Sequence, residues 1–518
     1  MGEPLTVDRL QHLTSWSAEW TGLRVVVVGT DARGFSAADT LVELGATVVV
    51  VDDAASVEQR RLLEVIGAEY REGALGDAPA LLHDGGWEVL VTSPRLEPGH
   101  PLHRWAEEGG VAVWSDVELA WRVRDKVDPA AEWLAVTGSS GKSTTAQLTT
   151  HLLEAASRRV ALVGAEGIPI LDAVRYPAGF DVLVVELSSR ELHWLGRTPE
   201  GTLSPWSSVC LGVADHLDGW HETMDDLRTS LGRVYANTRT VAIYNTADDA
   251  TLAMVEDAEV IEGCRAIGFG LGAPGPSDFG VVDGILCDRA FLTERATTAL
   301  ELSTRMELAS VGLGAAHTVA NVLAAAALAR STGAEPRVVR EAILSFRLHD
   351  HSSAVVADAE GVLWIDDSRA TTVHSAAAAL RAYRRVVWVL GGVGVGVADA
   401  VGTVIESERG RLAAVILIGV ARDALRAAFE RHAPEVPVFE VDSPDTEDVM
   451  PTAVALSAAV ARPGDAVLLA PAAASMDQFI DYADRGSRFA EAVRHHLGGG
   501  ADDHHPTLGT SDGPNSGD

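Results

Sequence analysis

The stretch Gly138-Ser139-Ser140-Gly141-Lys142-Ser143 follows a short apolar strand at 133–137 and precedes a predicted helix at 144–156. Its glycines allow backbone N–H groups to turn inward toward a phosphate, and the next helix adds its positive N-terminus. Lys142 can reach terminal phosphates and Ser143 can bind Mg²⁺. The alternative is a plain Gly/Ser turn before a helix. We predict an ATP-binding loop made of Gly138, Ser139, Ser140, Gly141, Lys142, Ser143 and Thr144.

Lysine usage favours the phosphate interpretation. The chain of 518 residues has 41 Lys+Arg, and only Lys126 and Lys142 are lysines. One of these two stands in the loop, where a flexible point charge suits a phosphate. Lys126, in Arg-Asp-Lys-Val-Asp, is interpreted as a solvated surface residue.

Two further acidic motifs are candidates for the same site. Glu186 ends the apolar strand at 181–186, and a carboxylate at the carboxyl end of a parallel strand suits Mg²⁺. Asp215 and His216 follow a strand at 209–213 and are candidates for a metal or phosphate contact. A solvated strand-end acid and a structural histidine remain the alternatives.

Strands and helices alternate in three blocks, which predicts an α/β protein of three domains. The first block, residues 1–130, is Rossmann-like: it has an apolar strand at 22–29, a helix at 36–44, and strands at 46–51, 87–92 and 111–113. The second, residues 131–335, is a central ATPase-type parallel sheet with further strands at 160–163 and 241–245. An alanine-rich helix at 318–330 closes it, and a linker is expected near 334–336.

The third block, residues 336–497, is again Rossmann-like, with strands expected at 362–365, 386–390, 414–418 and 466–469. Residues 498–518 offer nothing to bury and are expected to be a disordered tail.

Composition excludes several classes of protein. The formal charge of −33 argues against a nucleic-acid partner. Three scattered cysteines suit neither a disulfide framework nor a zinc site. No apolar run approaches the ~20 residues of a membrane span, and the N-terminus lacks an apolar signal segment. We expect a cytoplasmic protein without membrane insertion.

Motifs in all three blocks together resemble the Mur ligase family of peptidoglycan synthesis, most closely its D-glutamate-adding ligases of actinobacterial type. In chain order they are 138–143, Glu186-Leu187-Ser188-Ser189, Asp215-His216-Leu217, His317 with Asn321, 366–371, 471–477, and Arg485-Gly486 with Phe489.

The resemblance implies an ATP- and Mg²⁺-dependent amide ligase that adds D-glutamate to UDP-N-acetylmuramoyl-L-alanine through an acyl phosphate, and a monomer. It implies that Lys142, Glu186 and His216 are catalytic, and that Ser143, Glu186 and His216 hold metal. Asn321 and Asp367 match nucleotide-contacting positions. Substrate contacts are expected from Ser188, Arg369, Thr371, Ser475 and Tyr482. The first domain is expected to hold the uridine nucleotide of the acceptor, and the third to deliver the amino acid.

Several positions depart from the family pattern. Leu231 replaces a lysine that is carbamoylated in the family and bridges to a second metal. Arg369 and Val395 also replace lysines, and Ser352 replaces an arginine. Thr318 and Ala165 replace asparagines, and Asp31 stands in a turn where glycine is usual. The alternatives are therefore a diverged paralogue with another acceptor or amine, and a non-catalytic ATP-binding relative.

Overall fold

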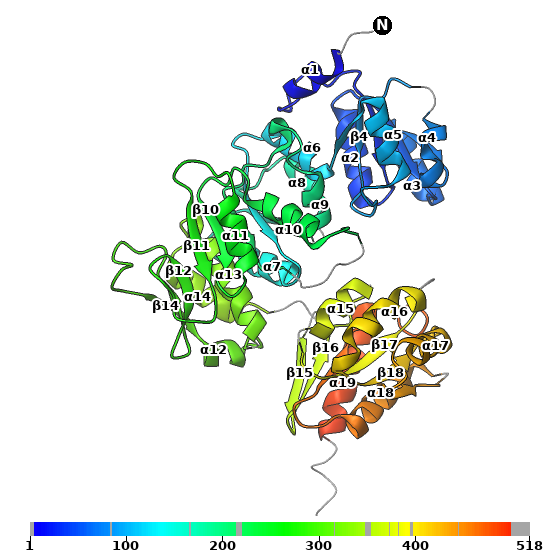
Figure 1. Ribbon diagram of the computed structural model, residues 1–518, viewed down its shortest axis with the longest axis vertical. Helices are drawn as coiled ribbons and strands as arrows, with labels where there is room; N and C mark the ends of the chain where they lie inside the picture. The colour runs from blue at the N-terminus through cyan, green and yellow to red at the C-terminus, as the bar shows by residue number, and fades with distance from the viewer. Residues whose placement is uncertain are drawn as a thin grey trace, which may run out of the picture. The chain divides into compact units, whose positions relative to one another are not determined.

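The computed structural model describes residues 5–82, 85–164, 167–213, 220–314, 316–347, 354–371, 373–381, 383–393, 397–443 and 445–498. The chain divides into two compact units, residues 1–346 and 347–518 (Figure 1). The first unit contains two sheets and the second contains one.

The first sheet is parallel, with the strand order β3-β2-β1-β4-β5. Its strands are β1 (Arg24–Val28), β2 (Thr47–Asp52), β3 (Glu69–Glu72), β4 (Val89–Val91) and β5 (Ala112–Trp114). The helices of this part are α1 (Leu5–His12), α2 (Ala32–Glu43), α3 (Val57–Ile66), α4 (Ala78–Leu81), α5 (Pro101–Gly109) and α6 (Asp116–Arg122). The order reverses between β1 and β4, so a ligand crevice is expected beyond their carboxyl ends.

Helix α2 begins at Ala32, earlier than the helix predicted from residue 36. Asp31 is its N-cap, and the Asp31 carboxylate accepts hydrogen bonds from the backbone N–H groups of Arg33 and Gly34. This cap allows the helix to start inside the glycine turn, where apolar periodicity gives no signal.

The second sheet has nine strands in the order β14-β13-β12-β11-β10-β9-β6-β8-β7. Its parallel strands are β6 (Glu132–Thr137), β7 (Val160–Val163), β8 (Val182–Glu186), β9 (Ser207–Cys210), β10 (Val241–Asn245), β11 (Arg265–Phe269) and β12 (Asp278–Val282). At one edge β13 (Ile285–Asp288) and β14 (Leu300–Thr304) continue it in antiparallel pairing. The sequence predicted the parallel strands from β6 to β10 and missed β11, β12 and the antiparallel edge, whose strands are short and partly polar.

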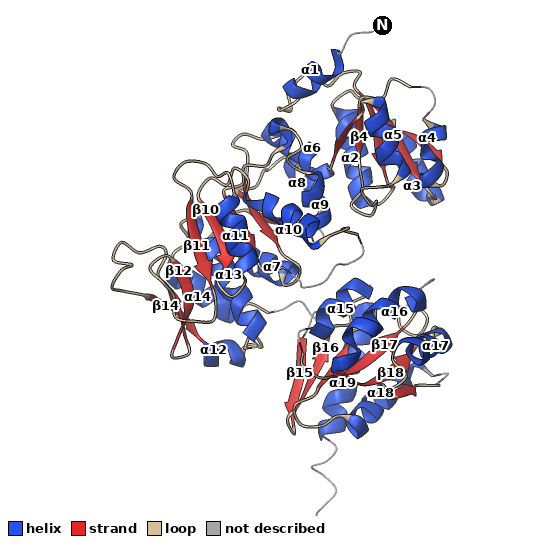
Figure 2. Cartoon of the chain, viewed as in Figure 1, coloured by secondary structure: helices blue, strands red, loops and turns tan. Residues whose placement is uncertain are grey.

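Helices cover both faces of this sheet (Figure 2). They are α7 (Lys142–Ala155), α8 (Ile170–Arg175), α9 (Ser189–Trp194), α10 (Met224–Gly232), α11 (Asp249–Asp257), α12 (Arg305–Ser310), α13 (Ala316–Ser331) and α14 (Pro336–Ser345). Helix α13 packs against α7 and is buried on nearly all sides, as its alanine-rich sequence predicts. Helix α14 buries Val339 and Ile343 in the same unit, so this unit ends at Phe346, beyond the predicted linker.

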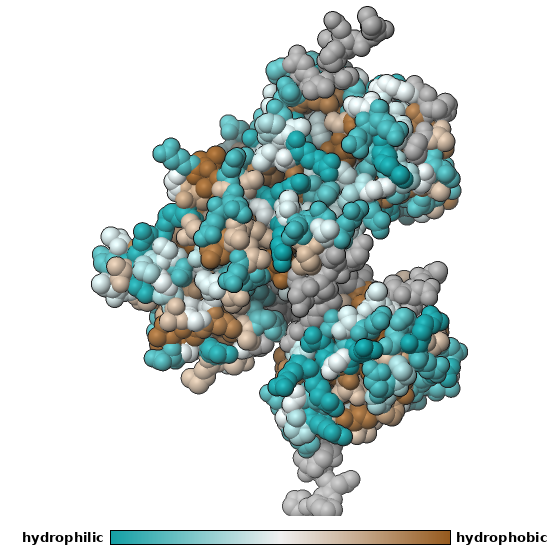
Figure 3. Space-filling view, in the orientation of Figure 1, coloured by the Kyte–Doolittle hydropathy of each residue, from teal (hydrophilic) through white to brown (hydrophobic). Residues whose placement is uncertain are grey.

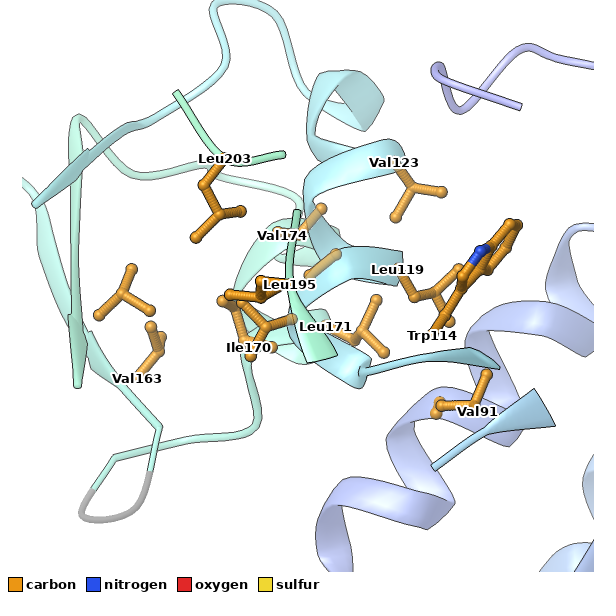
Figure 4. Close-up of a cluster of buried hydrophobic side chains, with 14 of the residues drawn as sticks. Val91, Trp114, Leu119, Val123, Val163, Ile170, Leu171, Val174, Leu195 and Leu203 are labelled. Carbon is orange, nitrogen blue, oxygen red and sulfur yellow. The ribbon is translucent and has the colours of Figure 1, made fainter. Parts of the chain in front are cut away.

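The two sheets of the first unit share one apolar core. Figure 4 shows Val91, Trp114 and Leu119 in the same cluster as Ile170 and Leu171 from α8. Because this core is continuous, the parts of the chain that carry β1 and β6 are held together by side-chain burial.

The second unit has a six-stranded sheet in the order β15-β16-β20-β17-β18-β19. Its strands are β15 (Ala354–Ala359), β16 (Val362–Asp366), β17 (Val386–Gly391), β18 (Leu412–Ile418), β19 (Val438–Glu440) and β20 (Ala466–Leu469), and only β15 pairs antiparallel. Its helices are α15 (Val373–Arg381), α16 (Val397–Glu408), α17 (Arg422–His432), α18 (Thr446–Val460) and α19 (Tyr482–Gly498). Helix α19 includes Gly498, and the rest of the predicted tail lies outside the described residues.

On the face shown in Figure 3, apolar residues form small patches among hydrophilic ones. Among the described residues, no helix is both long enough and apolar enough to cross a membrane.

Candidate active site

The predicted phosphate loop joins β6 to α7, as the sequence indicated. Gly138 has φ +137° and Gly141 has φ +80°, conformations that favour glycine. A Cβ on Gly141 would lie 2.6 Å from Asn321 Oδ1, and one on Gly138 would lie 3.0 Å from the backbone nitrogen of Leu211. The loop therefore depends on both glycines, and Gly141 forms the N-cap of α7.

Helix α7 begins at Lys142, two residues before its predicted start, so Lys142 and Ser143 are its first residues. Lys142 Nζ donates a hydrogen bond of 2.8 Å to the carbonyl of Gly138. Burial lowers the pKa of the Lys142 ammonium, and the carboxylates of Glu186 and Glu191 only partly offset this. The ammonium thus lies beside the N-terminus of α7, where a phosphate group would also be stabilised by the helix.

Glu186 is the last residue of β8 and is 2% exposed. Its Oε1 accepts a 3.0 Å hydrogen bond from Ser143 Oγ, so the structure brings these two predicted residues together. A hydroxyl and a carboxylate oxygen beside a phosphate loop fit Mg²⁺, which is usually held by one or two protein groups, substrate phosphates and water. Within the described ranges, no three His, Cys, Asp or Glu side chains gather into a metal site. His216 lies outside those ranges.

Asn321 reaches the loop from α13. Its side chain is 8% exposed and lies so close to Gly141 that a methyl group on Gly141 would collide with it. His317 is the second residue of this helix and is exposed. Tertiary packing of α13 on α7 brings Asn321 to the loop, although 180 residues separate it from Gly141 in sequence.

Ser188 is the N-cap of α9. Its hydroxyl accepts a hydrogen bond from the backbone N–H of Glu191 and donates to Glu191 Oε2 at 2.7 Å. The structure thus places Ser188, predicted to contact substrate, in a capping box directly after Glu186 and Leu187.

The sequence analysis missed Glu191, which lies five residues after Glu186, and its ion-pair partner Arg33. The spacing Ser188-x-x-Glu191 is typical of a capping box and could have indicated Glu191, whereas no motif in the sequence indicated Arg33. Burial alone would lower the pKa of Arg33, but the carboxylates of Asp116 and Glu191 outweigh it and raise this pKa.

In the second unit, the predicted site residues gather at the carboxyl edge of two neighbouring strands. Asp367, Arg369 and Thr371 follow β16, and Ser475 follows β20. Ser475 is 3% exposed, whereas Tyr482 is 39% exposed.

Arg485 organises this edge from α19. It is fully buried and donates to Ser368 Oγ at 2.9 Å, to the Ser368 carbonyl at 2.9 Å and to the Ala473 carbonyl at 3.1 Å. Burial lowers its pKa to about 10, with Asp477 and Asp366 opposing the shift. Ser368 Oγ donates in turn to the carbonyl of Tyr482. Arg485 therefore ties the segments after β16 and β20 to α19.

Comparison with known proteins identifies the family. Residues 136–329 match the Mur ligase middle domain. A UDP-N-acetylmuramoylalanine–D-glutamate ligase from Leifsonia xyli is 55% identical over 504 residues, which cover 96% of this chain and 97% of that protein. The chain belongs to the Mur ligase family. The enzyme of the same name from Streptomyces avermitilis is 47% identical, over 92% of this chain and 98% of its own length.

Among solved structures, this Mur ligase is similar to a pseudomurein peptide ligase type C from Methanothermus fervidus. That match has 13% identity and a TM-score of 0.48, and covers 91% of this chain and 99% of the other. A UDP-N-acetylmuramate–alanine ligase from Thermotoga maritima matches with 16% identity and a TM-score of 0.45, over 92% of this chain and all of the other.

One expected feature of Mur ligases does not fit this chain. Leu231, where the resemblance predicts a carbamoylated lysine, lies in α10, is 1% exposed and belongs to the apolar core of the first unit. A leucine side chain can neither form a carbamate nor bind a metal ion. The residue present therefore does not support a carbamate-bridged second metal. Ala165, Ser352 and Val395 lie outside the described residues.

Proposed function

We propose that this chain is an ATP-dependent amide ligase that joins D-glutamate to UDP-N-acetylmuramoyl-L-alanine. The observation that carries the proposal is 55% identity, over nearly the full length, to a relative named for that reaction. The glycine loop with Lys142, and the Ser143–Glu186 pair beside it, support the energy-coupling half of the reaction.

In the proposed mechanism, the acceptor carboxylate attacks the γ-phosphorus of ATP and ADP leaves, which gives an acyl phosphate. The amine of D-glutamate then attacks the acyl carbon, loses a proton and expels phosphate, so that an amide bond forms. Lys142 neutralises charge on the transferring phosphoryl group, and preorganised cations of this kind stabilise the transition state. Ser143 and Glu186 hold Mg²⁺, which, when bound, offsets charge on the phosphate oxygens.

Further residues have proposed roles in binding. Asn321, beside Gly141, contacts the nucleotide together with the loop 138–144. Asp367, directly after β16, is assigned a nucleotide contact of its own. Arg369, Thr371, Ser475 and Tyr482 bind substrate at the carboxyl edge of the third sheet, and Ser188 does so after β8. Arginine at position 369 retains a cation able to bind a carboxylate through two hydrogen bonds.

We place this reaction in the cytoplasm and assign it to a monomer. The three cysteines are free, as a reducing compartment requires.

The deciding experiment is phosphate release by the purified full chain with ATP, Mg²⁺, UDP-N-acetylmuramoyl-L-alanine and D-glutamate. We expect phosphate and a new amide product in equal amounts, and no product when D-glutamate is omitted. Absence of both phosphate and product would reject the proposal.

A second candidate function rests on Asp31, whose carboxylate caps α2 in the turn after β1, where the resemblance predicts a glycine beside the acceptor's pyrophosphate. This candidate is a diverged ligase with another acceptor or amine. A screen of amino acids and carboxylates for ATP turnover distinguishes the two, since strict dependence on D-glutamate excludes the second candidate. In either case turnover is expected to be unchanged when bicarbonate is removed, because position 231 carries no amine.

A further inference from the structure

Arg33 connects two carboxylates that come from different parts of the first unit. It lies in the first turn of α2, directly after the loop that follows β1. Its Nε and Nη2 donate to the two oxygens of Asp116, each at 2.8 Å, and Nη2 lies 2.5 Å from Glu191 Oε1. Asp116 begins α6, beside the first sheet, whereas Glu191 lies in α9, beside the second. The guanidinium thus bridges the two sheets of the unit.

Glu191 uses its second oxygen to cap α9. Oε2 accepts hydrogen bonds from the backbone N–H and the hydroxyl of Ser188, at 2.6 and 2.7 Å. Only Leu187 separates Ser188 from Glu186, the last residue of β8. A single carboxylate therefore links the Arg33 guanidinium to the backbone next to the proposed Mg²⁺ ligand.

We propose that Arg33 is a positioning residue for the ligation: it fixes the start of α9, and with it the Glu186 end of β8, relative to the turn after β1. This inference rests on the proposed function in one respect, because the Mg²⁺-binding role of Glu186 comes from it. The ion pairs of Arg33 with Asp116 and Glu191 do not depend on that role.

Burial makes this bridge sensitive to loss of the cation. The side chains of Asp116 and Glu191 are 7% and 2% exposed. Removing Arg33 leaves two buried carboxylates without the cation they share, which is far more costly than breaking a solvated pair. Displacement of Glu191 would also release the cap of α9.

Another arginine provides a matched control. Arg175, the last residue of α8, pairs with Asp39 and Glu43 of α2, so it also bridges the two sheets. Its partners are 33% and 45% exposed and both lie on α2, whereas Arg33 pairs with a residue of α9. If Arg33 only helped to hold the two sheets together, loss of Arg175 would change α9 and the ligation as much as loss of Arg33.

The test compares amide hydrogen exchange of full-length Arg33→Ala, Arg33→Lys, Arg33→Ala/Glu191→Gln and Arg175→Ala proteins with that of the wild type. In Arg33→Ala, exchange at residues 187–194 is expected to rise about 10-fold, because the local opening free energy falls when the cap is released. Arg175→Ala should leave this segment unchanged. The double variant should return toward wild-type exchange at 187–194, since a glutamine side chain in place of Glu191 removes the one of the two buried charges that lies on α9 and can still cap this helix. Arg33→Lys is expected to lie between wild type and Arg33→Ala.

Kinetics supply the second readout. For Arg33→Ala, kcat for ligation is expected to fall about 10- to 100-fold with KM for D-glutamate unchanged, as for a misplaced catalytic group. The double variant should recover part of this loss.

The inference is overturned if Arg33→Ala shows wild-type exchange at 187–194, or if Arg175→Ala raises exchange there as much as Arg33→Ala does. A wild-type chain without product rejects the proposed function, while the exchange comparison still decides the role of Arg33. If Arg33→Ala does not fold, Arg33→Lys and the double variant decide the outcome.

Discussion

Ser143 Oγ donates a 3.0 Å hydrogen bond to Glu186 Oε1, which joins the second residue of α7 to the last residue of β8. The two residues stand 43 positions apart in sequence. They meet because β6, which leads into α7, pairs directly with β8 in parallel register. The oxygens of this pair face the phosphate loop at the carboxyl edge of the sheet, where α/β proteins bind ligands.

Glu186→Gln is expected to raise the Mg²⁺ concentration needed for half-maximal phosphate release and to lower kcat about 100-fold, because it removes the charge that holds the cation but keeps the side-chain volume. Phosphate release measured across a Mg²⁺ titration checks this. Glu58→Gln, at an exposed glutamate of α3, serves as control. An unchanged Mg²⁺ requirement would contradict the assignment of Glu186.

The two lysines allow a direct comparison. Lys142→Ala is expected to reduce ATP turnover about 1000-fold, since a preorganised cation at the transferring phosphoryl group is lost. Lys126 pairs with Glu43 and lies 3.9 Å from the ring centre of Trp16, so Lys126→Ala should leave turnover near the wild-type rate. If Lys142→Ala turned over ATP as fast as Lys126→Ala, Lys142 would have no role in phosphoryl transfer.

Gly141→Ala is expected to abolish binding of a non-hydrolysable ATP analogue. The added methyl group would collide with Asn321 at 2.6 Å, in a backbone conformation that alanine adopts only at a cost of about 1 kcal/mol. Isothermal titration calorimetry measures the loss. Asn321→Ala alone removes the proposed nucleotide contact of Asn321 and serves as the reference. Gly141→Ala/Asn321→Ala relieves the collision but keeps the backbone strain, so it should bind only slightly more weakly than Asn321→Ala. A single variant with wild-type affinity would show that the loop does not bind ATP.

Leu231→Ala is expected to lower the free energy of unfolding by about 2–5 kcal/mol, as for other buried leucines. Urea unfolding of both proteins measures the difference. Leu62 of α3 is 45% exposed, so Leu62→Ala should cost much less. Similar costs for the two variants would mean that Leu231 is not a core residue.

Acid is expected to destabilise the first unit through His103. This side chain is buried, its Nδ1 donates to the Glu97 carbonyl at 2.9 Å, and burial lowers its pKa from 6.5 to about 4. Between about pH 6.5 and pH 4 the unfolded chain binds the proton more readily than the folded one, so stability falls as pH falls through this range. The loss approaches about 3 kcal/mol below pH 4. Unfolding free energies from pH 7 to pH 4.5 should decline less steeply in His103→Gln than in wild type, and equal slopes would contradict this origin.

Motif spacing predicted the parts of the molecule that depend on local chemistry. The Gly138–Ser143 loop, the helix after it and the buried strands around Val26 and Val184 follow from residue type and periodicity. The first residues of helices were harder to predict. Helices α2 and α7 begin earlier than expected, because Asp31 and Gly141 are their N-caps. The antiparallel edge of the second sheet carries too weak a pattern to be predicted.

The sequence by itself determined the family, the three α/β sheets and most residues of the phosphate loop, since these depend on contiguous motifs and on similarity along the whole chain. Tertiary structure alone decided which distant residues meet. It placed Asn321 against Gly141, buried Leu231 in an apolar core and bridged Asp116 and Glu191 through Arg33. Such pairings are set by the packing of whole helices on a sheet, and a single arginine in the first turn of a helix leaves no periodic signal in the chain.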